Sequence, residues 1–206
     1  MAIQFRQMIF YGVAAELQQC PDPGLPEIVL SGRSNVGKSS LVNTLGENRS
    51  LARTSNTPGK TRLIIYFQLD KKAWVVDLPG YGHAVVSKTA RDKYSGLADQ
   101  YLGSGRPMAL VLFLIDIRHS PSADDHVMLD WLETAGLPYQ VVLTKADKLS
   151  RSAALARRLE IARELDLEEP ESLLVFSAQT KIGLDDVRQV IDHHVQAWYD
   201  GRDQGR

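Results

Sequence analysis

The sequence predicts an α/β fold: a mainly parallel six-stranded sheet with one antiparallel edge strand and helices on both faces. Short apolar runs rich in β-branched residues alternate along the chain with amphipathic stretches of helical length. That alternation is typical of parallel strands buried under helices on both sides. At residues 70–72, two apolar runs are separated by a turn too short for a helix. These two strands should therefore be antiparallel and lie at one edge of the sheet.

Six strands are expected along the chain, at residues 28–30, 63–69, 73–77, 109–116, 140–144 and 173–177. The first strand leads directly into a helix that begins at residues 37–39. Ser120 and Pro121 suit the N-cap and the first position of a further helix. The final helix carries an apolar stripe at helical spacing, which consists of Leu184, Val187, Ile191, Val195 and Trp198.

Length and composition indicate one folded domain. The chain has 206 residues, of which 44% are hydrophobic and 24% are charged, as in an average soluble domain. We expect residues 1–25 to form an N-terminal lead-in, residues 26–199 the domain and residues 200–206 a flexible tail. The net charge of -1 lacks the basic excess of a dedicated nucleic-acid-binding protein, but it is compatible with a local basic face.

The expected location is the cytoplasm. Cys20 is the single cysteine of the chain, which excludes an internal disulfide and suits a reducing compartment. The most apolar run, residues 108–115, is much shorter than the ~20 residues of a membrane-spanning helix. The N-terminal residues lack the continuous apolar core of a secretory signal, and no membrane partner is expected.

Residues 32–39, Gly-Arg-Ser-Asn-Val-Gly-Lys-Ser, match the pattern G-x-x-x-x-G-K-[ST] between a strand and a helix. The glycines let the backbone approach phosphates closely, so that several N–H groups and the helix N-terminus point at anionic oxygens. Lys38 supplies a positive charge to the β- and γ-phosphates, and the Ser39 hydroxyl can bind Mg²⁺. A chance match in a glycine-bearing turn is the weaker interpretation. The motif alone leaves kinases, ATPases and GTPases open.

The base is indicated by residues 144–147, Thr-Lys-Ala-Asp, at the end of a predicted strand. The Asp147 carboxylate can accept two hydrogen bonds from guanine, whereas adenine offers no such pair of donors and would leave a buried carboxylate unpaired. The Lys145 stem can lie along the face of the base. Alone, this motif would be an ordinary polar loop; downstream of a phosphate-binding loop it predicts guanine recognition.

Three further elements follow in the order that a guanine-nucleotide switch requires. Asp77 ends a strand and can hold Mg²⁺ through water, and the Gly80 N–H can meet the γ-phosphate. Thr61, at the end of a long polar loop, can add a second hydroxyl to the metal. Residues 177–178 follow the last strand, where a backbone N–H can reach the guanine oxygen. Together these elements predict a guanine-nucleotide switch domain.

Two positions bear on the rate of hydrolysis. In many switch GTPases a Gln that orients the attacking water follows the D-x-x-G motif. Here that position is Tyr81, so we expect slow intrinsic hydrolysis that needs an outside contribution. Asn35 occupies a position that resembles the K⁺-coordinating Asn of some related GTPases. The alternative, that Asn35 simply tolerates the loop turn, stays open.

The chain resembles the EngB (YihA/YsxC) group of small bacterial GTPases within the translation-factor-related class. The resemblance covers residues 4–199 and is carried by residues 32–41, 50–61, 76–82, 116–119 and 144–149. His83 departs from the pattern, because an aromatic residue is expected there. The resemblance implies a Ras-like P-loop GTPase that assists assembly of the large (50S) ribosomal subunit and is needed for septation and normal cell division.

The expected site residues follow from the motifs and the resemblance. Catalysis is assigned to Lys38, Thr61 and Gly80, and Mg²⁺ binding to Ser39, Thr61 and, through water, Asp77. GTP or GDP is expected to bind at Gly32, Arg33, Ser34, Asn35, Val36, Gly37, Lys38, Ser39, Gly59, Lys60, Thr61, Arg62, Leu63, Asp77, Leu78, Pro79, Gly80, Thr144, Lys145, Ala146, Asp147, Phe176, Ser177 and Ala178.

The partners implied are GTP or GDP and the large ribosomal subunit or its precursor, with the protein acting as a monomer. Basic residues that could contact rRNA are Lys88, Arg91, Lys93, Arg151, Arg157, Arg158 and Arg163. An ordinary solvated face is the favoured explanation of these charges. Two other functions stay open from the residues: a P-loop nucleotide kinase and a GTPase switch that acts on a non-ribosomal target.

Overall fold

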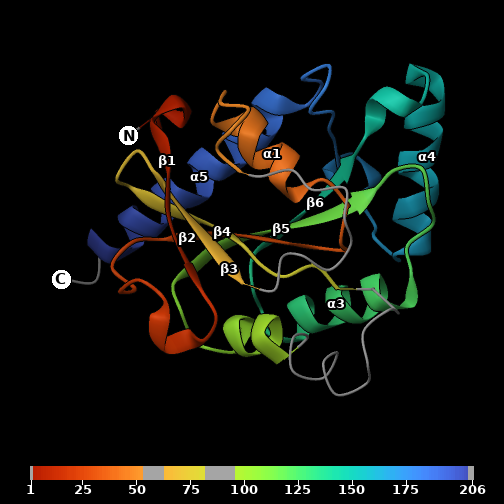
Figure 1. Cartoon of the computed structure of the whole chain (residues 1–206). Helices are drawn as coiled ribbons and strands as arrows, with labels where there is room; N and C mark the ends of the chain where they lie inside the picture. The colour runs from red at the N-terminus through yellow and green to blue at the C-terminus, as the bar shows by residue number, and fades with distance from the viewer. Residues whose placement is uncertain (1, 53–62, 82–95, 204–206) are drawn as a thin grey trace.

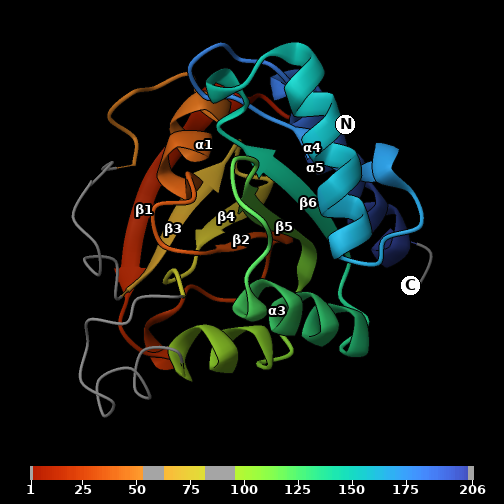
Figure 2. The same cartoon turned by 90° about the vertical axis from the view of Figure 1, so that its right-hand side faces the viewer.

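A seven-stranded sheet forms the centre of the molecule, with helices on both faces (Figures 1 and 2). The computed structural model describes residues 2–52, 63–81 and 96–203. The strands are β1 Met8–Ala14, β2 Glu27–Gly32, β3 Ile64–Leu69, β4 Ala73–Asp77, β5 Met108–Asp116, β6 Tyr139–Thr144 and β7 Leu174–Val175. Their order across the sheet is β1-β3-β4-β2-β5-β6-β7. β3 pairs antiparallel with both of its neighbours, and all other pairs are parallel.

The sheet separates the hydrophobic core into two clusters, and helices cover the cluster on each face. Their bounds are α1 Lys38–Leu45, α3 Ala123–Thr134, α4 Arg151–Glu164 and α5 Leu184–Asp203, and residues 96–102 are also helical. Short 3-10 turns are η1 Phe5–Gln7, η2 Leu17–Gln19, η3 Ala146–Lys148 and η4 Pro170–Ser172. Apolar residues of α1 and α5 pack on one face of the sheet. Those of α3, α4 and residues 96–102 pack on the other face.

The predicted α/β fold with its antiparallel pair is confirmed, but the sheet has seven strands where six are predicted. The additional strand is β1, which falls within the expected lead-in of residues 1–25. It pairs with β3 from Met8–Leu69 to Ala14–Ile64, with a bulge between Phe10 and Gly12. β3 is therefore an inner strand, and β1 takes the edge position that the sequence assigns to the antiparallel pair.

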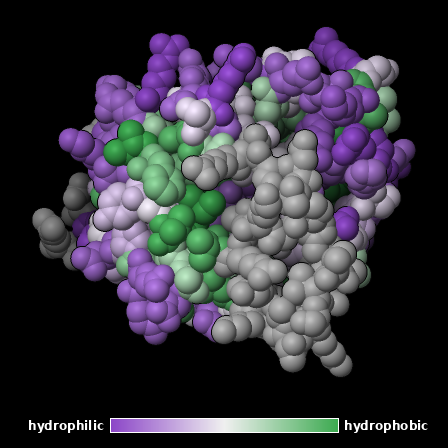
Figure 3. All heavy atoms as spheres, in the orientation of Figure 1, coloured by the Kyte–Doolittle hydropathy of each residue, from purple (hydrophilic) through white to green (hydrophobic). Residues whose placement is uncertain are grey.

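The sequence does not predict β1 because this strand lacks the alternation of apolar and polar residues that identifies strands. Only its end residues Met8 and Ala14 are buried. β1 is an edge strand that contains a bulge, so neighbouring elements cover little of either of its faces. Figure 3 shows hydrophobic side chains gathered over this part of the surface. Ile9, Phe10 and Val13 of β1 are each about half exposed. The burial of the β1 side chains, and therefore their hydrophobic pattern, depends on the pairing of β1 with β3, which is distant in the sequence.

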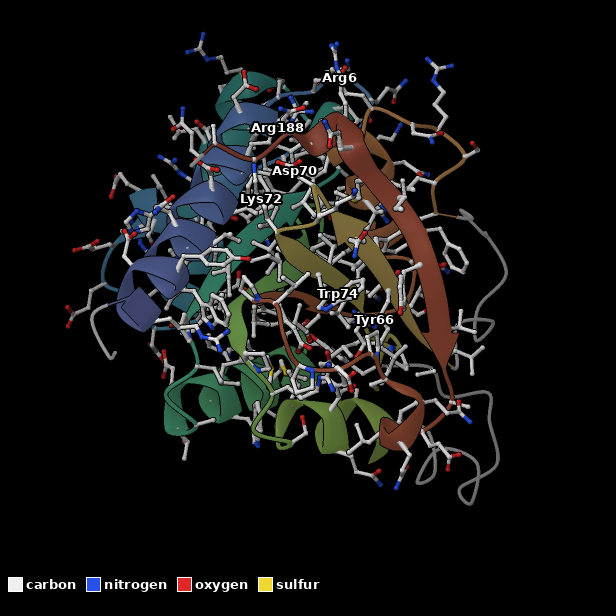
Figure 4. The ribbon with its side chains drawn as sticks, turned by 90° about the vertical axis from the view of Figure 1, so that its left-hand side faces the viewer. Arg6, Tyr66, Asp70, Lys72, Trp74 and Arg188 are labelled. Atoms are coloured by element: carbon white, nitrogen blue, oxygen red, sulfur yellow. The ribbon has the colours of Figure 1, made fainter. Side chains whose placement is uncertain are left out.

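Ion pairs and hydrogen bonds fasten the N-terminal residues to the rest of the fold. Glu47 accepts hydrogen bonds from Arg6, just before β1, at 3.0 Å and from Arg188 of α5 at 3.0 Å. Lys72, in the turn between β3 and β4, donates to the Ala2 carbonyl at 3.0 Å. Figure 4 labels Arg6, Lys72 and Arg188 on this side of the molecule. The N-terminal residues thus belong to the folded domain.

Two helix ends differ from the sequence-based expectation. Ser122, not Ser120, is the N-cap of α3, because Asp125 three residues later completes a capping box with it. α5 continues to Asp203, so the helix includes residues 200–203 of the expected tail. Within the described residues, no helix has the length and apolar character needed to cross a membrane.

Candidate nucleotide-binding site

The loop of residues 32–37 connects the carboxyl end of β2 to the start of α1. Gly32 has a φ of +148° and Gly37 a φ of +119°, values that side chains rarely allow. A Cβ atom on Gly32 would lie 2.7 Å from the Leu114 carbonyl oxygen of β5. The end of β6 also restrains the loop, because the Thr144 hydroxyl donates to the Val36 carbonyl at 2.6 Å. The predicted phosphate-binding loop is therefore in place and tightly fixed.

Lys38 and Asp77 form a buried charged pair beside this loop. The Lys38 Nζ atom lies 4.0 Å from Asp77 Oδ1 and 3.4 Å from the Gly32 carbonyl oxygen. Burial lowers the pKa of Lys38. Burial also raises the pKa of Asp77 to about 6, although the Lys38 charge and a hydrogen bond from Ser39 act in the opposite direction. Because both groups are expensive to hold charged without close partners, this pair is suited to receive a charged ligand.

The surroundings of Asp77 fit a Mg²⁺ ion. Its buried Oδ1 atom has no hydrogen-bond partner among the described residues, and Ser39 lies close enough to lower the pKa of the same carboxylate. Hydroxyl and carboxylate oxygens are ligands that Mg²⁺ prefers. Ser39 and Asp77 are thus the described residues that could hold the metal, directly or through water.

The turn after β4 packs against the phosphate-binding loop. A Cβ atom on Gly80 would lie 2.7 Å from the Ser34 backbone nitrogen, so only glycine allows this approach. Ser34 donates its backbone N–H to the Tyr81 carbonyl at 3.1 Å, and Arg33 and Tyr81 form a parallel β-bridge. The D-x-x-G segment therefore lies directly beside the loop.

Lys145 joins the base end of the site to the phosphate loop. Its backbone has a φ of +63°, and its Nζ atom donates to the Asn35 carbonyl at 2.8 Å. The same Nζ lies 2.9 Å from Asp116 Oδ2. Burial would raise the pKa of Asp116, but hydrogen bonds from Arg118 and Lys145 outweigh it and hold this pKa well below its usual value. The Lys145 side chain is thus held across the loop by an ionised carboxylate.

Asp147 is also held by its neighbours. The Ser177 hydroxyl donates to Asp147 Oδ1 at 2.8 Å, and Lys148 Nζ lies 3.1 Å from Oδ2. Burial opposes ionisation, but these two contacts outweigh it and lower the pKa of Asp147. A carboxylate accepts hydrogen bonds through both oxygens, so Asp147 can receive the ring N–H and the exocyclic amine of guanine.

A cavity of about 230 Å³ adjoins the outer side of the phosphate loop. Its lining comes from the loop, the end of β5, the residues that follow it and the start of α3. These residues are Arg33, Ser34, Asn35, Val36, Leu114, Ile115, Asp116, Arg118, His119, Ser120, Asp125 and Lys145.

Most of the predicted site residues that the structure describes meet at the carboxyl ends of β2, β4, β6 and β7. Some of them contribute backbone only, because their side chains are buried in the core: Val36, Leu78 and Phe176. Leu63 is exposed before β3 and is not brought to the loop by any contact within the described residues. The predicted residues Gly59, Lys60, Thr61 and Arg62 lie outside the described residues.

The contacts of three groups at the site do not follow from the motifs, although Thr144 and Asp116 themselves lie within residues 144–147 and 116–119. Asp116 holds Lys145, the Thr144 hydroxyl holds the loop, and Asp125 receives the Tyr81 hydroxyl at 2.8 Å. Asp116 could have been suspected, because it is the last residue of an apolar strand next to the phosphate loop. For Asp125, the sequence shows only a helix start.

Comparison with known proteins identifies the family. Residues 27–145 match the model of the family described as 50S ribosome-binding GTPase. The probable GTP-binding protein EngB of Clostridioides difficile strain 630 is 40% identical over 188 residues, which cover 91% of this chain and 93% of that protein. The chain belongs to the EngB family of GTP-binding proteins. EngB of Streptococcus sanguinis strain SK36 is 45% identical over 172 residues, with 84% and 88% of the two chains covered.

Solved structures confirm the P-loop GTPase fold. A crystal structure of a probable GTP-binding protein EngB superposes with a TM-score of 0.68 at 20% identity, covering 83% of this chain and 99% of the other. Era in complex with MgGDPNP and nucleotides 1506–1542 of 16S ribosomal RNA gives a TM-score of 0.65 at 23% identity, covering 82% and 56%. Membership of the EngB family supports GTP binding and GTPase activity over the kinase alternative left open by the sequence.

Proposed function

We propose that this EngB-family GTPase is a Mg²⁺-dependent switch that assists assembly of the large ribosomal subunit. The observation that carries the ribosomal part is the match of residues 27–145 to the family of 50S ribosome-binding GTPases. The site geometry is compatible with a switch, because Gly80 lies against Ser34 of the proposed phosphate-binding loop and Asp77 lies 4.0 Å from Lys38. A role in cell division and septation, in the cytoplasm, follows as part of the same proposal.

The chemistry at the phosphate end is electrostatic. Lys38 and the loop N–H groups are the groups that would neutralise the β- and γ-phosphates. Ser39, Thr61 and Asp77 would hold Mg²⁺, which would supply further positive charge to the phosphates during hydrolysis. Gly80 offers its N–H to that γ-phosphate. Tyr81 offers no amide to orient water, and its hydroxyl is engaged by Asp125. We therefore propose slow intrinsic hydrolysis that a partner accelerates.

A potassium ion is a second proposal at this site. Asn35 has a positive φ of 62° and its carbonyl is bound by Lys145, so its backbone is fixed while its side chain stays exposed at the cavity. GTP turnover measured in matched KCl and NaCl buffers tests it. Faster turnover in KCl that disappears in an Asn35→Ala variant supports the ion, and equal rates in both salts contradict it.

The protein is proposed to contact rRNA locally. Arg157 on α4 is engaged by Glu160 and Glu164 of the same helix, which leaves Arg151 and Arg163 as exposed cations there. Such a contact should weaken steeply as salt rises, because binding to phosphates releases counterions.

Co-sedimentation with purified large subunits tests the proposal. We expect the protein, acting as a monomer, to pellet with the subunits in a non-hydrolysable GTP analogue and Mg²⁺, and to stay in the supernatant in GDP. The Lys38→Ala variant controls for binding that does not depend on nucleotide. Equal pelleting in GTP analogue, in GDP and with Lys38→Ala would show that the association is not switched by nucleotide.

A further inference from the structure

Tyr81 occupies the position after Gly80, and its partly buried side chain extends toward α3. Its hydroxyl donates to Asp125 Oδ1 at 2.8 Å. Burial, and then the negative charge of Asp125, raise the pKa of Tyr81 far above its usual value. The phenol therefore stays protonated and acts as a hydrogen-bond donor throughout the neutral range.

Asp125 is a rigid acceptor for this bond. Its side chain is buried, with 2% of the residue exposed. The Oδ2 atom accepts the Ser122 backbone N–H at 2.7 Å and the Ser122 hydroxyl at 2.7 Å, which closes the capping box of α3. Oδ1 is left for Tyr81. The hydroxyl thus binds to a carboxylate that the helix start has already placed.

The backbone of the same turn is fixed on the opposite side by the phosphate loop. Ser34 donates its N–H to the Tyr81 carbonyl at 3.1 Å, and Gly80 approaches Ser34 so closely that no Cβ fits between them. Tyr81 therefore links three elements that are distant in sequence: the turn after β4, the loop after β2 and the start of α3.

We propose that Tyr81 is a positioning residue for GTP: its bond to Asp125 holds Gly80 beside the phosphate loop before a γ-phosphate arrives. This inference rests on the proposed role of the Gly80 N–H at the γ-phosphate. A group that is already placed loses less freedom on binding than one that must first be ordered. Because GDP has no γ-phosphate, the contact between Tyr81 and Asp125 should favour GTP over GDP.

The test is the ratio of two affinities, measured by titration of Tyr81→Phe with a non-hydrolysable GTP analogue and with GDP. The substitution removes only the hydroxyl. Because the lost bond joins a neutral donor to a charged acceptor, the GTP analogue should bind about tenfold more weakly, with GDP affinity unchanged. Asp125→Ala should give the same change in ratio, and combining the two should add nothing further.

Two matched variants separate this role from plain stability. Tyr139→Phe removes a hydroxyl that donates to Glu133 at 2.8 Å, remote from the phosphate loop. Ser150→Ala weakens the cap of α4 and leaves Tyr81, Asp125 and Ser122 in place. Both should keep the parental ratio, even where Ser150→Ala lowers the melting temperature.

Each outcome of these titrations either supports or overturns the positioning role of Tyr81. A selective loss of affinity for the GTP analogue in Tyr81→Phe, absent from both control variants, supports the proposal. A parental ratio in Tyr81→Phe, or an equal loss for GTP analogue and GDP, overturns it and makes the bond purely structural. If the unaltered protein bound neither nucleotide, the assignment of the site would itself be wrong, and the positioning role would fall with it.

Discussion

The phosphate end and the base end of the site hold their charges in different ways. At the phosphate end, Lys38 and Asp77 are buried 4.0 Å apart, and Asp77 Oδ1 has no hydrogen-bond partner among the described residues. At the base end, both oxygens of Asp147 are engaged, by Ser177 and Lys148. The charges at the phosphate end are incompletely compensated among the described residues, whereas the carboxylate at the base end is already held by protein contacts.

This difference predicts which end of the site determines nucleotide affinity and which determines selectivity for the base. Charges that lack full compensation gain most when phosphates and Mg²⁺ arrive, so the phosphate end should dominate affinity. A prearranged carboxylate costs little to bring into contact with the right base, so the base end should dominate selectivity. Substitutions at either end, or at Lys145 between them, should therefore change affinity and selectivity to different extents.

The largest loss is expected for Lys38→Ala. The substitution deletes the cation proposed to bind the β- and γ-phosphates and leaves Asp77 buried without its nearest opposite charge. Affinity for both GTP and GDP should fall by about 100-fold or more, measured by titration with a fluorescent nucleotide. The exposed variant Arg49→Ala should bind as the parent does. Near-parental binding by Lys38→Ala would show that the phosphates lie elsewhere.

Lys145→Ala should weaken GTP and GDP alike, by about tenfold. The change removes the bond to the Asn35 carbonyl and one partner of Asp116, both independent of the γ-phosphate. Lys145→Met separates the two roles of this residue, because it keeps the apolar stem and loses the charge. If Lys145→Met bound nucleotide as the parent does, the bond to Asn35 would carry none of the affinity.

Gly80→Ala should lower affinity for a GTP analogue by about fivefold to tenfold and leave GDP binding unchanged. The new Cβ would lie 2.7 Å from the Ser34 nitrogen, so the turn has to move off the phosphate loop. Gly24→Ala, where nothing lies within 4 Å of the added atom, is the control. Equal losses for GTP and GDP would mean that Gly80 does not meet the γ-phosphate.

The smallest change is expected for Ser177→Ala. The hydroxyl donates to Asp147 and accepts the backbone N–H groups of Gln179 and Thr180. Its loss should lower GTP affinity by about threefold and reduce the preference for GTP over other nucleotides, since Lys148 still holds the second oxygen. Competition titrations with GTP and ATP measure both effects. A tenfold or larger loss would show that Lys148 does not hold the carboxylate by itself.

The phosphate end could be predicted from the sequence because its parts are adjacent in the chain. Residues 32–39 combine glycines, a lysine and a serine at a spacing that few other structures need, and the structure places them at the end of β2. The antiparallel pair of β3 and β4 is equally local, since three residues separate the two strands. In both cases the residues that signal the structure are those that form it.

What the sequence could not predict depends on contacts between distant residues. β1 is a strand because it pairs with β3, whose residues lie fifty or more positions later in the chain, and its own residues do not alternate. The bonds from Thr144 to Val36 and from Tyr81 to Asp125 join residues 108 and 44 positions apart. Serine, threonine and aspartate are common at helix starts and strand ends, so their types alone do not identify such partners.

The central claim is that the guanine nucleotide bound at Asp147 controls association with the large ribosomal subunit. Asp147→Asn replaces the acceptor for the exocyclic amine with an amide that can donate to the oxygen of xanthine. We predict that the variant pellets with large subunits in a non-hydrolysable xanthosine triphosphate analogue and not in the GTP analogue, the reverse of the unaltered protein. Pelleting that is the same for both proteins in every nucleotide would contradict the account.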